Sequence, residues 1–104
     1  MSQFTFAAAD DAHLKITVAE PKFDAANAAA FKEELEKHWS PSVKQVTIDF
    51  SEVQFIDSSG VGALLSVQKK IPAGGEPVIL SGAKPNVVSV IELLRLHRVF
   101  TIRP

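Results

Sequence analysis

The chain has 104 residues, 46% of them hydrophobic and 22% charged, which is the composition of a single globular domain and excludes global disorder. It contains no cysteine, which excludes disulfides, thiolate metal sites and a cysteine nucleophile. The net charge is −1. Residues 1–57 carry five Lys/Arg and ten Asp/Glu, a charge of −5, whereas residues 58–104 carry six Lys/Arg and two Asp/Glu, a charge of +4. Neither half is basic enough to predict direct binding of nucleic acid.

The first elements that the sequence predicts are two strands of a hairpin. Apolar and polar residues alternate over residues 4–6 and again over residues 14–18, which is typical of half-buried strands. Asp10 and Asp11 lie between the two runs, and aspartate is a common turn residue. We therefore expect the chain to begin with a β-hairpin.

A helix is predicted next. Asp24 is a candidate N-cap, and the alanine-rich stretch 25–30 that follows it has a high helix propensity. Phe31, Leu35 and Trp39 recur every four residues, so they lie on one apolar stripe of the helix. The helix is expected to end at the Ser-Pro pair that follows Trp39.

Strands and helices alternate in the rest of the chain. Strands are predicted at 43–50, 53–56, 78–80 and 99–102, and helices at 58–71 and 85–96. The strand–helix–strand passage 53–80 predicts a right-handed parallel crossover. The order β-β-α-β-β-α-β-α-β predicts an α/β fold, a mixed β-sheet with α-helices packed against it, in one domain over residues 1–104.

One segment carries candidate chemistry, the passage from strand to helix at Asp57-Ser58-Ser59-Gly60-Val61-Gly62. Asp57 or Ser58 as an N-cap accounts for one or two of its polar residues. Gly60 and Gly62 each cost about 1 kcal/mol relative to alanine inside a helix. Their presence has two explanations that the sequence leaves open: tight packing of the helix on the strand, or close approach of a partner.

The start of a helix also bears on what a phosphate would do there. Unpaired N–H groups and the positive end of the helix dipole favour an anion, so we expect phosphorylation to leave this segment folded. A phosphate would add about two negative charges beside Asp57. An acidic or apolar partner docked on this surface would then be repelled.

The run Val46-Thr47-Ile48-Asp49-Phe50, followed by Phe55-Ile56-Asp57-Ser58-Ser59-Gly60-Val61-Gly62, resembles the STAS domain of bacterial anti-sigma factor antagonists. The resemblance extends over nearly the whole chain, with weaker similarities at Phe23-Asp24 and along residues 85–94. The sequence departs from the family pattern in two loops: no glycine precedes Phe23-Asp24, and Arg95 stands where a glycine commonly follows the late helix.

The resemblance implies a STAS-like fold and a partner-switching regulator of transcription. It implies that Ser58 is phosphorylated by an anti-sigma factor that is itself an ATP-dependent serine kinase. Unphosphorylated antagonist would bind the anti-sigma factor and free a sigma factor, phosphorylation would abolish binding, and a phosphatase would act on phospho-Ser58. The implied partner-binding residues are Asp24, Asp57, Ser58, Ser59, Gly60 and Gly62.

Two other classes of function compete with this one. In a constitutive STAS accessory or scaffold subunit of a lipid-transport ATPase or signalling assembly, Ser58 would only cap the helix, and in a scaffold Ser59 or both serines would be targets. An enzyme is disfavoured because a serine nucleophile needs a base, and His13, His38 and His97 are expected on the solvated surface. The sequence lacks a Gly-x-Ser-x-Gly elbow, spaced metal ligands and a phosphate-binding loop, so no cofactor or metal is expected.

The expected location is the cytoplasm. The first six residues lack the basic and apolar regions of a signal peptide. No apolar run approaches the roughly 20 residues of a membrane-spanning helix.

Overall fold

The computed structural model describes residues 3–104, so the first two residues of the predicted domain lie outside it. The elements, in chain order, are β1 (Phe4–Ala8), β2 (His13–Val18), β3 (Lys22–Phe23), α1 (Ala28–His38), β4 (Gln45–Asp49), β5 (Phe55–Ile56), α2 (Ser58–Lys70), β6 (Ile79–Ser81), α3 (Pro85–Leu93), the short 3₁₀ helix η1 (Leu96–Arg98) and β7 (Thr101–Arg103). The predicted order of strands and helices is confirmed, with β3 as an additional strand.

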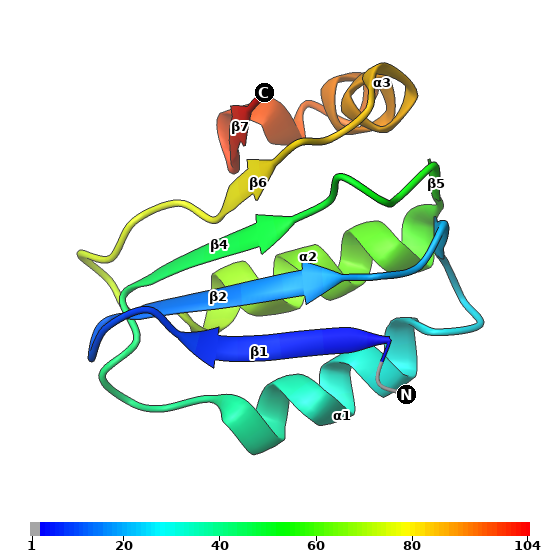
Figure 1. The fold of residues 1–104 in the computed structure, drawn as a ribbon. Coiled ribbons are helices and arrows are strands. Elements are labelled where there is room, and N and C mark those ends of the chain that lie inside the picture. The colour runs from blue at the N-terminus through cyan, green and yellow to red at the C-terminus, as the bar shows by residue number, and fades with distance from the viewer. Residues whose placement is uncertain (1–2) are drawn as a thin grey trace.

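Five of the strands form one mixed sheet in the order β1-β2-β4-β6-β7 (Figure 1). β1 and β2 are antiparallel, with Phe4 opposite Val18, and the remaining neighbours are parallel. Asp10 accepts a hydrogen bond of 2.8 Å from the Ala12 N–H in the turn between β1 and β2. The N-terminal hairpin is therefore confirmed.

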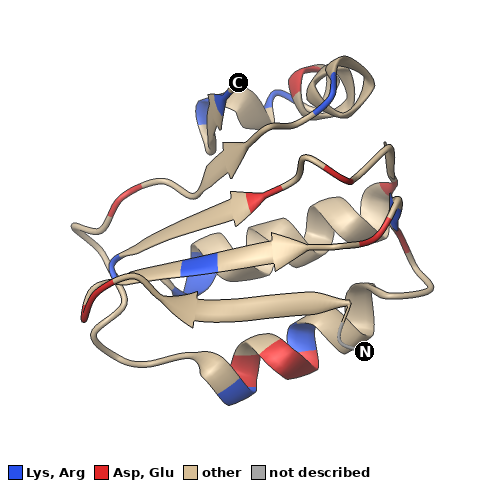
Figure 2. Cartoon of the chain, in the orientation of Figure 1, with Lys and Arg blue, Asp and Glu red and all other residues tan. Residues whose placement is uncertain are grey.

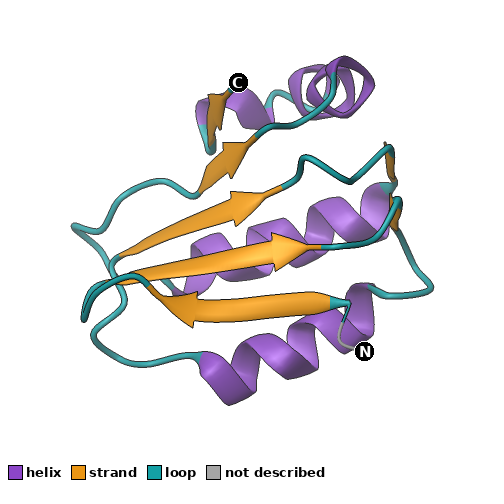
Figure 3. Ribbon diagram, viewed as in Figure 1, coloured by secondary structure: helices purple, strands orange, loops and turns teal. Residues whose placement is uncertain are grey.

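The apolar residues of the strands gather on one face of this sheet. Val46 and Ile48 of β4 are fully buried there, while Thr47 between them faces the other side and is only partly buried. α2 runs behind the strands in Figure 1, and α1 contacts both α2 and β1 (Figures 1 and 3). Phe31 and Leu35, on the predicted apolar stripe of α1, are buried in the core. Trp39, just after the helix, is partly buried and packs against the same core.

A second, two-stranded sheet lies outside the main one and was not predicted. In it β3 and β5 pair in parallel. The expected crossover over residues 53–80 is therefore wrong at its start, because β5 does not belong to the sheet that contains β6; β4 and β6 are the parallel neighbours, with α2 between them in the chain. The backbone leaves the main sheet in a turn where Asp49 accepts a 2.9 Å hydrogen bond from the Ser51 N–H.

The turn at the end of β4 makes a pH-dependent contribution to stability. The hydrogen bonds from Ser51 hold the pKa of the Asp49 carboxyl below its usual range, with a smaller contribution from Lys15. Because the pKa is lower in the folded chain, the stabilisation is present above the unfolded pKa of about 3.9 and is lost as the pH falls through the lower folded value. We expect Asp49→Asn to reduce the unfolding free energy by about 1 kcal/mol at pH 7 and by less at pH 3, measured by urea unfolding. An equal loss at both pH values would contradict this.

α1 begins one turn later than predicted, at Ala28, with Asn27 as the N-cap residue. Asp24 is therefore not the N-cap; its carboxylate accepts the Ala26 N–H at 3.0 Å and its carbonyl accepts the Ala28 N–H at 2.9 Å, so a separate turn precedes the helix. The buried Asn27 side chain fixes this turn by accepting the Asp24 N–H at 3.0 Å and donating to the Lys22 carbonyl at 2.7 Å.

Candidate functional site

Asp57 organises the start of α2, as its N-cap. Its Oδ1 atom accepts the N–H groups of Ser59 at 2.9 Å and Gly60 at 3.0 Å. Its Oδ2 atom accepts the Ala25 N–H at 3.4 Å. This single carboxylate therefore joins the turn before α1 to the first turn of α2, at the ends of the paired strands β3 and β5.

We expect Asp57→Ala to lower the unfolding free energy by about 1–2 kcal/mol, since it removes the cap and the link to Ala25. Asp57→Asn is the matched control because its single amide oxygen can still accept the N–H groups of Ser59 and Gly60, while only the bond to the Ala25 N–H is lost. Urea unfolding should show a clearly smaller loss for the asparagine variant. Equal losses would mean that the side-chain hydrogen bonds do not matter to stability.

The two serines of the segment differ in their surroundings. Ser58 is exposed, and its hydroxyl has no hydrogen-bond partner among residues 3–104. Ser59 is partly buried and lines a shallow groove of about 290 Å³ between α1 and α2, together with Ala25, Ala28, Ala29, Lys32 and Gly62. The hydroxyl open to a modifying enzyme is that of Ser58.

The N–H groups at the start of α2 are less available than the sequence predicts. Those of Ser59 and Gly60 donate to the Asp57 side chain, and that of Val61 donates to the Asp57 carbonyl at 3.0 Å. The expectation that unpaired amides here would hold a phosphate is therefore wrong for these three. A phosphate on Ser58 would lie near the Asp57 carboxylate, and the helix dipole would still favour it.

The two glycines have different reasons to be glycine. A Cβ atom on the buried Gly60 would lie 2.1 Å from the Phe23 carbonyl oxygen and 2.8 Å from Cγ1 of Ile56. Gly60 is thus explained by tight packing of α2 against β3 and β5. A Cβ atom on Gly62 would meet nothing within 4 Å, so packing inside the described chain does not explain Gly62.

The sequence matches the profile of the STAS domain over residues 7–104. The chain belongs to the STAS domain family. Solved structures show the same fold. A Thermotoga maritima protein assigned as an anti-sigma factor antagonist is 23% identical, with a TM-score of 0.80 over 97% of this chain and 86% of that one. An anti-sigma factor antagonist from Mycobacterium paratuberculosis is 22% identical, with a TM-score of 0.79 over 97% and 86%.

A third structure, phosphorylated SpoIIAA, a Bacillus cell fate determinant, is 19% identical, with a TM-score of 0.71 over 95% of this chain and 89% of that one. At these identities the similarities establish the fold of this STAS domain. No helix within residues 3–104 is both long enough and apolar enough to cross a membrane.

The STAS fold brings the predicted site residues to one end of the molecule. Asp24 precedes Ala25, which is bonded to Asp57, and Ser58 to Gly62 form the first turns of α2. The role of Asn27 was not predicted from the sequence. The available signal was an asparagine, a poor helix former, within a run of alanines. Phe55 was also missed; it is 48% exposed in β5 just before Asp57, and alternation with the buried Ile56 was the signal there.

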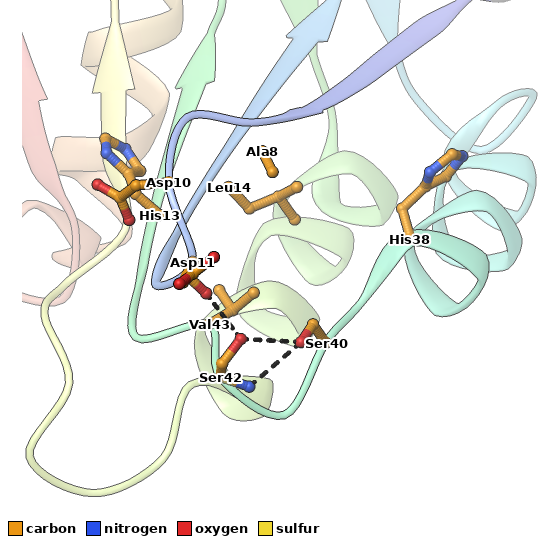
Figure 4. A pocket seen from close by; sticks show the side chains of 9 residues that line it. All are labelled: Ala8, Asp10, Asp11, His13, Leu14, His38, Ser40, Ser42 and Val43. Atoms are coloured by element: carbon orange, nitrogen blue, oxygen red, sulfur yellow. Dashed lines mark hydrogen bonds between the residues drawn. The ribbon is translucent and has the colours of Figure 1, made fainter.

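The histidines of the STAS domain do not join this site. His13 begins β2, at the other end of the sheet, and bonds Thr47 Oγ1 at 2.8 Å; it is partly buried, so its expected place on the solvated surface is wrong. His38 stacks on Phe6 with ring centroids 4.7 Å apart. Both line a cavity of about 410 Å³ near the hairpin turn, where His38 lies apart from His13 (Figure 4).

Proposed function

We propose that this STAS domain is an anti-sigma factor antagonist that acts by partner switching. In its unphosphorylated form it binds an anti-sigma factor that is a serine kinase, and the sigma factor is released. Phosphorylation of Ser58 abolishes this binding. The observation that carries the proposal is the exposed Ser58 hydroxyl at the start of α2, on a fold shared with anti-sigma factor antagonists.

The surroundings of Ser58 support a switch that works by charge. A phosphate adds about two negative charges and takes the net charge from −1 to about −3. Since Asp57 already occupies the amides of Ser59 and Gly60, the helix end neutralises little of that charge. A partner that tolerates the Asp57 carboxylate would then face a larger, uncompensated anion.

The surroundings of Ser58 also support the view that this surface binds its partner without rearrangement. The hydrogen bonds of Asp57 and of the buried Asn27 fix the two segments that flank the serine. The partner would contact Asp24, Asp57, Ser58, Ser59, Gly60 and Gly62. In that interface Gly60 contributes backbone only, while the absent side chain of Gly62 leaves room for the partner.

Affinity capture of partners from the native cell, with phosphosite mapping of the same sample, tests the proposal. The captured kinase is then purified and incubated with this protein and ATP. Mass spectrometry should find one phosphate, on Ser58; Ser59→Ala should still be modified and Ser58→Ala should not.

Full modification of Ser58→Ala would overturn the assignment of the site. Capture of a lipid-transport ATPase in place of a kinase would identify the domain as a constitutive accessory subunit. A phosphatase active on phospho-Ser58 should restore binding of the purified kinase, and failure of the dephosphorylated protein to bind would contradict the switch.

A further inference from the structure

A second surface with the features of a binding site lies at the far end of α3. We call it the α3 tip; it comprises Leu93, Leu94, Arg95, Arg98 and Val99. Leu93 is 83% exposed, Leu94 49% and Val99 36%, and among residues 3–104 the only other large hydrophobic side chain exposed to this degree is Phe55. Large apolar side chains so close together and so open to water are typical of an interaction site.

Two of the three arginines of the protein, Arg95 and Arg98, belong to the α3 tip, and the third, Arg103, lies in β7. They are exposed, no Asp or Glu follows Glu92, and none of the three forms an ion pair within the described chain. Figure 2 shows several Lys or Arg positions near the C-terminus. The other eight cationic residues, distributed over the rest of the chain, are all lysines.

Arg95 adopts a left-handed backbone conformation, which residues other than glycine rarely adopt. Its φ of 59° is the only positive φ of a non-glycine residue in the part of the chain described. It directly follows Leu94, the C-cap of α3, at the place where helices favour a glycine because a side chain is strained there. The strained residue carries an exposed guanidinium that forms no ion pair in the described chain.

We propose that the α3 tip is a docking surface for a protein partner whose carboxylates surround an apolar pocket. The pocket takes the exposed leucines, and the carboxylates pair with the guanidinium groups. The use of arginine in place of lysine favours a protein over a lipid surface, because arginine is enriched at protein interfaces and lysine is depleted there. A second copy bound through the same tip would place arginines against arginines, so charge opposes self-association here.

This surface is separate from the one proposed to bind the anti-sigma factor. In the first turn of α3, Asn86 donates a hydrogen bond to the carbonyl of Gln54, the residue before β5, and the α3 tip is at the other end of that helix. Phosphorylation of Ser58 should therefore leave it free to bind.

The test is photo-cross-linking in the native cell, with a benzophenone amino acid at Leu93 of the full chain and mapping of the cross-linked peptides by mass spectrometry. One dominant adduct is expected, on a segment rich in Asp or Glu, and Ser58→Asp should not remove it. Arg98→Glu should reduce its yield at least tenfold, while Lys69→Glu, which reverses an exposed charge elsewhere, should not. No adduct above that of a probe at Thr5 on the sheet, or an adduct indifferent to Arg98→Glu, would overturn the proposal.

Arg95→Gly separates binding from folding. It should raise the thermal midpoint by a few degrees, since the left-handed strain is relieved, and weaken binding of the purified partner at least threefold. Unchanged affinity would contradict the role of Arg95. A different outcome would be no protein adduct, together with co-sedimentation with phosphatidylglycerol vesicles that is lost in Arg95→Gly and Arg98→Glu. This result would show that the α3 tip binds a membrane surface and would overturn the proposal of a protein partner.

Discussion

Gly60→Ala should lower the unfolding free energy by at least about 3 kcal/mol, a large part of the 5–15 kcal/mol typical of a domain. The added Cβ atom would lie 2.1 Å from the Phe23 carbonyl oxygen. That oxygen belongs to the backbone of β3, which is paired with β5 and cannot turn away as a side chain can. Relief of the clash requires α2 to move off β3, which would disturb the Asp57 cap as well.

Gly62→Ala is the matched control, two residues further along the same helix. Its Cβ atom would meet nothing within 4 Å, so the gain in helix propensity should raise the unfolding free energy by about 0.5–1 kcal/mol. Urea unfolding of both variants should therefore give effects of opposite sign. Two losses of similar size would show that Gly62 also serves packing. If Gly62 leaves room for the partner, the same alanine should weaken binding while it stabilises the fold.

Ser58→Asp should weaken binding of the purified anti-sigma factor at least tenfold, or about 1.4 kcal/mol, by calorimetry. The new carboxylate would lie next to Asp57, at a helix start whose amides at Ser59 and Gly60 are already bonded. Ser58→Asn is the uncharged control of the same size and should bind within about threefold of the parent. Circular dichroism should show that both variants are folded.

The comparison of the two Ser58 variants decides between charge and size. An equal loss for asparagine would mean that bulk at this position, and not negative charge, excludes the partner. Unchanged affinity of Ser58→Asp would contradict the charge mechanism, since the exposed side chain could then be accommodated at the interface.

Most of the fold could be predicted because the signals that determine it are local. The change from strand to helix periodicity at Ser58 coincides with a capping aspartate, and both features lie within one segment. β3 has only two residues and therefore no periodicity to detect; it exists because distant β5 pairs with it. Asp24 and Asn27 are both residue types that favour N-caps. The Asn27 side chain makes no cap hydrogen bond; it is buried and bonds the preceding turn, which a sequence does not display.

The candidate site was predictable in its residues but not in its internal relations. An exposed serine after Asp57 follows from the end of an apolar strand and the start of a helix. The different roles of Gly60 and Gly62 do not, because they depend on where the Phe23 backbone lies. The hydrogen bonds from the first amides of α2 to the Asp57 side chain likewise depend on side-chain geometry. The sequence therefore could not show that these amides, expected to contact a phosphate, are already bonded.

The two-stranded sheet makes the position of Ser58 depend on the length of a loop. Its register consists of only two pairs, Lys22 with Phe55 and Phe23 with Ile56. A single residue inserted or deleted between β4 and β5 would leave the five-stranded sheet in register. It would shift β5 by one place against β3, or force the loop to absorb the change, and a one-place shift turns each side chain to the opposite face. In the divergence of such domains, this loop would tolerate substitution far better than a change in length.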